Sequence, residues 1–149
     1  VTTDLPEFDK RNICLRILGS RDGVSQTVLT AIDEAEARTA NNTGGVLCLC
    51  FNYGGQLELV DAYKKIVQSG ISGDEITTDV ISANLYAPEV PPIDLVVRTS
   101  GEQRLSNFML WRSAYSELMF IDKNWPDMTG ADVADILQEY NGRKRRFGG

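Results

Sequence analysis

Short apolar runs alternate with amphipathic segments along this 149-residue chain, and this alternation restricts the fold more than any other feature. The pattern predicts strands at residues 13–18, 46–51, 93–98 and 118–121, and helices at residues 25–39, 57–67, 77–86, 105–115 and 131–145. The run at 46–51 is almost continuously apolar, which is typical of a strand buried on both faces of a parallel sheet. We therefore expect an α/β fold with helices flanking a central, mainly parallel β-sheet.

The sequence contains no repeat, low-complexity stretch or linker, so we expect a single α/β domain over residues 1–149. Hydrophobic residues make up 42% of the chain, which is enough to build a core. Cys14, Cys48 and Cys50 fall in apolar strand-like runs, which predicts buried thiols in a reducing compartment. The chain has no histidine, which argues against a zinc site at these cysteines.

The overall charge bears on the kinds of partner that the chain can have. A net charge of −6 and a pI near 4.6 argue against general nucleic-acid binding. No apolar run approaches the roughly 20 residues of a membrane-spanning helix, and the first residues do not resemble a signal peptide. These features predict a cytoplasmic protein.

Four cations crowd the end of the chain: Arg143, Lys144, Arg145 and Arg146. Cations in the last turn of a helix complement its dipole, so this run is explained without any ligand. Contact with a phosphate group is the competing interpretation, and the residues alone leave both open.

In a parallel sheet, ligands bind beyond the carboxyl ends of the strands, and two stretches there have suitable residues. The first, Asn52-Tyr-Gly-Gly55, follows the strand at 46–51. Paired glycines before a helix let backbone N–H groups approach an anion. Such glycines also form tight turns, so this stretch is a weak signal.

The second stretch follows the strand at 93–98, which ends in Arg98. Arg104, Ser106 and Asn107 are expected at the start of the next helix, beyond a polar turn. Two guanidiniums, a hydroxyl and the free N–H groups of a helix suit phosphate oxygens. The alternative is that Ser106 or Asn107 caps the helix while the arginines form surface ion pairs.

Glu117 lies in the same part of the sequence. It is suited to a hard cation such as Mg²⁺, which prefers one or two carboxylates together with phosphate oxygens. It is equally suited to an ordinary surface position.

Five segments, taken in order, identify a family. They are Phe51-Asn-Tyr-Gly-Gly, residues 94–111, residues 113–118, Trp125-Pro-Asp127 and Arg145-Arg-Phe-Gly-Gly149. This series resembles the undecaprenyl diphosphate synthase family of cis-prenyltransferases. The resemblance implies a central parallel sheet, a dimer, Mg²⁺ dependence, and condensation of isopentenyl diphosphate onto an allylic diphosphate such as farnesyl diphosphate. A lipid product further implies peripheral contact with a membrane.

The resemblance also implies roles for particular residues. By position, Arg98, Arg104 and Ser106 match the family's residues that bind the isopentenyl diphosphate headgroup. Glu117 matches a carboxylate associated with Mg²⁺. Arg146 and Gly148 match a C-terminal element that reaches the diphosphate across the dimer interface.

The sequence departs from the family pattern in two single positions and in its first part. Gln56 stands where the family usually has arginine, and Arg112 where it usually has glutamine; we interpret both as surface positions or positions just behind the site. The match starts near residue 12, and the Met-Asp-Gly-Asn-Gly-Arg motif with the family's principal Mg²⁺-binding aspartate is absent. The chain thus resembles the C-terminal part of a cis-prenyltransferase domain, without the N-terminal portion of the fold.

Three interpretations follow from this partial match. The chain is a fragment of a full enzyme, a short binding subunit that completes the active site of an identical or different partner, or an inactive relic. We expect it to be poorly stable alone or to associate with another chain, and to show no turnover by itself. A doubly wound nucleotide-binding module is disfavoured, because residues 18–23 lack the Gly-x-Gly-x-x-Gly pattern.

Overall fold

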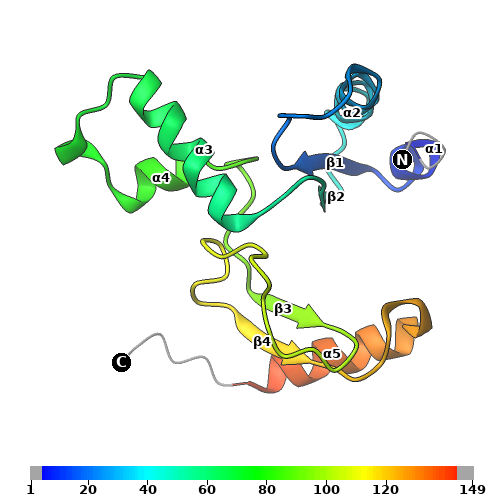
Figure 1. Ribbon diagram of the computed structural model, residues 1–149. Coiled ribbons are helices and arrows are strands. Elements are labelled where there is room, and N and C mark those ends of the chain that lie inside the picture. The colour runs from blue at the N-terminus through cyan, green and yellow to red at the C-terminus, as the bar shows by residue number, and fades with distance from the viewer. Residues whose placement is uncertain (1–4, 144–149) are drawn as a thin grey trace. The chain divides into compact units, whose positions relative to one another are not determined.

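The computed structural model describes residues 5–143, and the chain divides into two compact units, Val1–Glu89 and Val90–Gly149 (Figure 1). Each unit combines helices with one pair of parallel strands, so the α/β class predicted from the sequence is confirmed. The two units are described separately below. The single-domain organisation stays a prediction.

Over residues 5–89, the first unit contains two strands and four α-helices. In chain order its elements are α1 (Leu5–Lys10), β1 (Ile13–Leu18), α2 (Gln26–Thr39), β2 (Gly45–Cys50), α3 (Gly55–Gln68), the 3-10 turn η2 (Gly73–Glu75) and α4 (Thr78–Asn84). β1 and β2 are parallel, in a register that runs from Ile13 opposite Gly45 to Leu18 opposite Cys50. The predicted helices and strands of this unit are confirmed to within a few residues, and α1 was not predicted.

The second unit contains β3 (Leu95–Arg98), β4 (Glu117–Phe120), the 3-10 turn η3 (Trp125–Asp127) and α5 (Gly130–Gly142). β3 and β4 are also parallel, with Leu95 opposite Glu117 and Arg98 opposite Phe120. Thr129 caps α5: its hydroxyl accepts a bond from the Asp132 N–H, while the Asp132 carboxylate accepts one from the Thr129 N–H.

The predicted helix at residues 105–115 was wrong, because this segment is a series of turns. Ser106, Asn107 and Met109 have φ angles of 48°, 64° and 49°, in the left-handed region that a right-handed helix excludes. Two isolated turns remain, in which the Phe108 N–H donates to the Leu105 carbonyl and the Ser113 N–H to the Met109 carbonyl. The apolar spacing of the segment fits a helix, but tertiary contacts, among them the bonds from Arg98 to the Arg104 carbonyl and the Ser106 hydroxyl, override this local preference.

Two predictions of burial were also wrong. β2 is not covered on both faces, since Val46 is 57% exposed and Cys50 is exposed. The three cysteines therefore differ, with Cys14 buried, Cys48 partly buried and Cys50 exposed. Cys14 alone has the core position expected for all three.

The core of the first unit lies between β1 and the helices α1 and α2. Its buried centre is Leu5, Leu15 and Ala35, and side chains from both strands pack around it. Burial of these side chains is what holds the short α1 against the rest of the unit, since a helix of this length is not stable by itself.

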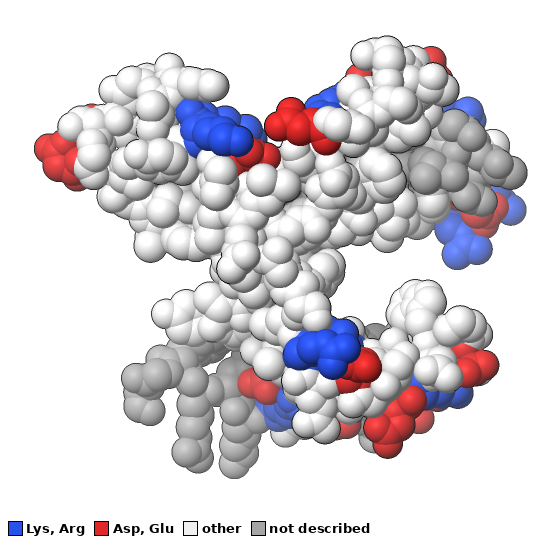
Figure 2. All heavy atoms as spheres, in the orientation of Figure 1, with Lys and Arg blue, Asp and Glu red and all other residues white. Residues whose placement is uncertain are grey.

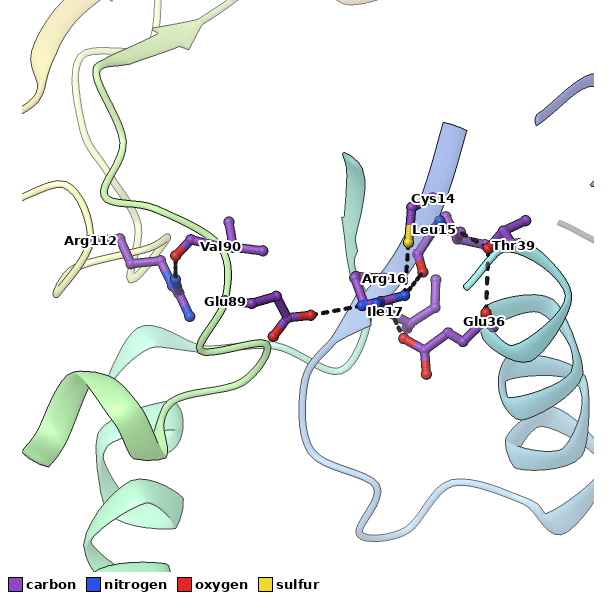
Figure 3. A network of polar contacts seen from close by, with 9 residues as sticks. All are labelled: Cys14, Leu15, Arg16, Ile17, Glu36, Thr39, Glu89, Val90 and Arg112. Carbon is purple, nitrogen blue, oxygen red and sulfur yellow. Dashed lines mark hydrogen bonds and ion pairs between the residues drawn. The ribbon is translucent and has the colours of Figure 1, made fainter. Parts of the chain in front are cut away.

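The edge of β1 that faces away from β2 is closed by side chains of α2, which Figure 3 shows, and by a side chain of the loop after α2. The Leu15 N–H donates to Thr39 Oγ1 at 3.0 Å, and the Ile17 N–H donates to Glu36 Oε1 at 2.7 Å. The Asn42 side-chain amide donates to the Ile13 carbonyl at 2.8 Å. Unpaired backbone groups at a strand edge can pair with a strand of another chain. At β1 these side chains occupy the backbone groups, so the edge is not available for such pairing.

Candidate anion-binding site

The loop that follows β3 turns sharply and returns onto the segment after β4. Ser100 and Gly101 both have a left-handed backbone, with φ angles of 68° and 69°. The Ser100 N–H donates to the Lys123 carbonyl at 3.0 Å, and the Gly101 N–H donates to the Ile121 carbonyl at 2.9 Å. The turn is thus fixed by the protein itself, and both of these N–H groups are already used.

Arg98, the last residue of β3, organises this loop. Its Nη1 donates to the Ser106 hydroxyl at 3.0 Å and also to the backbone carbonyl of Arg104. The Arg98 side chain is only 26% exposed, so its aliphatic part is largely covered while the guanidinium reaches the loop. These bonds bring Ser106 and the backbone of Arg104 to the carboxyl end of β3.

Arg104 is joined to Arg98 through a carboxylate. Arg104 Nη1 forms an ion pair with Glu102 Oε2, and Arg98 Nη2 lies 3.9 Å from the same oxygen. One carboxylate oxygen is therefore shared by two guanidiniums. Glu102 was not singled out in the sequence, although its position four residues after Arg98 and two before Arg104 was the available signal.

The structure thus brings Arg98, Arg104 and Ser106 together in one loop. The supporting argument from a helix was wrong, because no helix begins at Ser106 or Asn107 and no free N–H groups of a helix are available there. The surface ion pairs considered as the alternative are present, and their shared partner is Glu102. A loop whose two guanidiniums already converge on an oxygen anion is chemically suited to phosphate oxygens.

Glu117 is not beside this loop along the strand pair. It begins β4 opposite Leu95, three residues before the Arg98–Phe120 pair. At a rise of about 3.3 Å per residue, Glu117 and Arg98 are offset by about 10 Å along the strands.

The Glu117 carboxylate is engaged by Arg143, the residue after α5. Arg143 Nη1 lies 3.1 Å from Glu117 Oε2 and donates to the Leu118 carbonyl at 3.0 Å, while Nη2 lies 2.7 Å from Glu139 Oε1. The bonds to Glu139 and Glu117 raise the pKa of the Arg143 guanidinium above its usual value. Arg143 therefore joins the end of α5 to β4.

The described residues offer too few oxygen ligands in one place for a Mg²⁺ ion. Among residues 5–143, no three carboxylate, thiol or imidazole groups converge to hold a metal. Glu117 offers one carboxylate, already paired with a permanent cation, whereas Mg²⁺ needs further oxygen ligands. The described residues do not make a Mg²⁺ site by themselves. Arg146 and Gly148 lie outside the described residues.

The stretch Asn52-Tyr-Gly-Gly55 joins the loops at the carboxyl ends of β1 and β2. Asn52 has a φ angle of 50°, and its side-chain amide donates to the carbonyls of Ser20 and Asp22 at 2.8 and 3.2 Å. The Ser20 N–H donates in turn to the Asn52 carbonyl at 3.1 Å. Gly19 is required here, because a Cβ atom on it would lie 1.8 Å from the Phe51 carbonyl oxygen.

The start of α3 already holds a negative charge. Glu58 lies in the first turn of α3, is buried, and accepts bonds from the Tyr53 hydroxyl and the Tyr86 N–H. A carboxylate near a helix N-terminus is stabilised by the helix dipole and repels a second anion. The tight-turn interpretation of the two glycines therefore fits better than an anion site.

A cavity of about 310 Å³ opens at the carboxyl end of β1 in the first unit, between α2 and the segment after α4. Both of its arginines are paired with carboxylates: Arg16 Nε lies 2.8 Å from Glu89 Oε1, and Arg21 Nη2 lies 2.6 Å from Asp33 Oδ1. Such pairing is visible on the face drawn in Figure 2, where blue cationic and red anionic groups lie next to one another. The cavity offers no concentration of one charge.

The two positions that depart from the family pattern differ in burial. Gln56 is exposed, as expected. Arg112 is only 6% exposed, so it is not a surface residue, and its guanidinium donates to the Val90 carbonyl (Figure 3). Arg112 thereby fastens the proline-rich connector that precedes β3.

The chain is thus an α/β protein in which two guanidiniums converge in a loop at the carboxyl end of a parallel strand, where ligands bind in such folds. This loop is a candidate oxyanion site. Comparison with known proteins makes this more specific. Residues 1–148 match the prenyltransferase family model described as "Putative undecaprenyl diphosphate synthase". The chain therefore belongs to the undecaprenyl diphosphate synthase family of prenyltransferases.

Curated relatives support this assignment. The chain is 44% identical over 139 residues to an isoprenyl transferase from Neisseria meningitidis serogroup B, covering 93% of this chain and 55% of the relative. It is 44% identical over 142 residues to an isoprenyl transferase from Thermotoga maritima, covering 94% of this chain and 61% of the relative. The chain thus spans little more than half the length of these relatives.

Solved structures agree as well. A probable undecaprenyl diphosphate synthase from Campylobacter jejuni gives a TM-score of 0.90 at 28% identity, covering 99% of this chain and 69% of the other. Lavandulyl diphosphate synthase from Lavandula x intermedia, solved in complex with dimethylallyl diphosphate, gives 0.90 at 32% identity, covering 99% and 66%. Within residues 5–143, no helix combines the length and apolar character that crossing a membrane demands.

Proposed function

We propose that this chain binds the diphosphate group of isopentenyl diphosphate in the loop from Arg98 to Ser106, as part of a cis-prenyltransferase. The observation that carries the proposal is the convergence of the Arg98 and Arg104 guanidiniums, together with the Ser106 hydroxyl, at the carboxyl end of β3. Guanidiniums bind phosphate oxygens through short, charge-assisted bonds, and a hydroxyl adds a further donor. Membership of the family supplies the substrate class.

The reaction joins two isoprenoid units. The C–O bond between the allylic carbon and its diphosphate group breaks as that carbon is attacked by the π-electrons of the isopentenyl double bond. Positive charge develops at carbon, and loss of one proton, together with the released diphosphate, leaves the new double bond of the product. The part proposed for Arg98, Arg104 and Ser106 is to hold the isopentenyl headgroup, which places its double bond in a fixed position. No step is assigned to the described residues at the leaving group.

The wider proposal follows the family pattern. Arg146 and Gly148 reach the diphosphate of a partner protomer in a homodimer or heterodimer, Mg²⁺ accompanies the substrates with Glu117 nearby, and the protein is cytoplasmic with peripheral membrane contact through its lipid product. For Glu117 to bind Mg²⁺, it must exchange its Arg143 partner for the ion.

A second candidate is a non-catalytic subunit that binds isopentenyl diphosphate and completes the active site of a partner. Both candidates use the same loop. They differ in whether the catalytic activity belongs to the protein of which this chain is part or to a partner.

Calorimetric titration with isopentenyl diphosphate tests the shared part of the proposal. Arg98→Ala and Arg104→Ala should each weaken binding by about 1.5–3 kcal/mol, the worth of a hydrogen bond to a charged group. Arg11→Ala is the control, because the Arg11 side chain is 67% exposed, its ion-pair partner is Glu7 in the first unit, and the substitution removes an equal charge. Equal affinity of all four proteins would exclude the loop as the headgroup site.

A further inference from the structure

Glu102 occupies the place at which the loop is proposed to receive its anion. Its Oε2 atom is in contact with Arg104 and lies 3.9 Å from Arg98 Nη2. The Glu102 side chain is 38% exposed and that of Arg104 is 63% exposed, so both can move into solvent when a ligand arrives. Arg98 is more covered and is also held by Ser106, so it is the fixed member of the three.

A carboxylate and a phosphate oxygen make the same demand on a guanidinium, since each accepts charge-assisted hydrogen bonds in its plane. The two cannot use the same donors of Arg98 and Arg104 at once. An incoming oxyanion must therefore displace Glu102, and the displaced carboxylate stays nearby as a like charge.

We propose that Glu102 is an internal counter-anion of the loop, which keeps Arg98 and Arg104 converged in the absence of ligand and competes with the oxyanion that binds there. This inference rests on the proposed function of the loop. It assigns to Glu102 the opposite sign of effect from its neighbours: Arg98 and Arg104 strengthen anion binding, and Glu102 weakens it. The apparent affinity equals the intrinsic affinity multiplied by the fraction of molecules in which Glu102 does not hold the guanidiniums.

The size of the effect follows from the exposure of the groups. An ion pair between exposed groups is worth a factor of up to about five in an equilibrium constant. Glu102 contacts two guanidiniums, one of them at 3.9 Å. Replacing its charge should therefore tighten anion binding by about three- to tenfold, with less effect at high salt because exposed charges are screened.

The test is calorimetric titration of the 149-residue chain with inorganic diphosphate, without metal, at low and high salt. Glu102→Gln keeps the shape of the side chain and removes its charge. Asp135→Asn is the matched control, because Asp135 is an exposed carboxylate on α5 of the same unit and its loss changes the net charge equally. Circular dichroism of each variant verifies that the fold is kept.

The inference predicts tighter binding by Glu102→Gln, no change by Asp135→Asn, and loss of the gain when Glu102→Gln is combined with Arg104→Ala. Equal or weaker binding by Glu102→Gln, with the wild-type chain binding diphosphate, overturns the role of Glu102 and leaves the proposed function intact. Absence of diphosphate binding in both the wild-type chain and Glu102→Gln overturns the proposed function, and this inference with it.

Discussion

Replacing Thr39 by valine tests whether side chains of α2 close the edge of β1. Thr39 is fully buried, and its hydroxyl accepts from the Leu15 N–H at 3.0 Å and donates to the Ala35 carbonyl at 3.0 Å, with the Glu36 carbonyl as a more distant partner at 3.5 Å. Valine has nearly the same shape but cannot accept a hydrogen bond. Leu15 is also fully buried, so water cannot replace the lost partner.

The magnitude follows from these two bonds. Leaving the buried Leu15 N–H without an acceptor costs about 1–3 kcal/mol. The Ala35 carbonyl loses less, because it lies within α2, where the helix supplies its own donor. The added methyl group of valine returns at most about 0.8 kcal/mol through burial. We expect a net loss of about 1–2 kcal/mol in the free energy of unfolding.

Hydrogen exchange at the Leu15 amide, measured beside urea unfolding, is the decisive assay. Thr39→Ser is the control, since it keeps the hydroxyl and loses only a methyl group. The Leu15 amide should exchange about tenfold faster in Thr39→Val, because 1.4 kcal/mol corresponds to a factor of ten, and should change little in Thr39→Ser. Equal protection of this amide in the two variants would refute the argument that Thr39 closes the β1 edge.

Two further predictions concern other parts of the chain. Asp132 has its pKa lowered to about 2 by bonds from Lys123 and then Thr129, so its contribution to stability is complete above its unfolded pKa of about 3.9 and is lost as the pH falls through about 2. The stability difference between wild type and Asp132→Asn should therefore be present at pH 7 and vanish near pH 2; a difference that is unchanged at pH 2 would contradict this origin. α3 exposes an apolar stripe of Leu57, Val60, Tyr63 and Val67, so we expect the purified chain to sediment as an associated species. We also expect the chain alone to give no product from isopentenyl and farnesyl diphosphates. A monomer with one cooperative unfolding transition, or measurable turnover, would contradict these expectations.

Apart from α1, which was not predicted, and residues 105–115, which form turns, the sequence by itself determined the order of helices and strands and most of their limits. The run at 13–18 is a strand in the structure, and the segment at 25–39 is α2, because the period of apolar residues is a local property of the chain. It also supplied the chemistry of the candidate site, since Arg98, Arg104 and Ser106 lie within nine residues of one another, directly after a strand. Their proximity in sequence is sufficient to place them in one loop.

Only the tertiary structure decided what surrounds those residues. Residues 105–115 have the apolar spacing of a helix but form turns, and the Arg98 side chain, which binds Ser106 and the Arg104 carbonyl, is part of the arrangement that replaces it. The shared position of Glu102 between two guanidiniums depends on that same turn. Likewise, the strand register sets Glu117 about 10 Å along from Arg98, and Arg143 reaches it from the far end of α5. These contacts depend on how the backbone folds, so no local pattern of residue types could have predicted them.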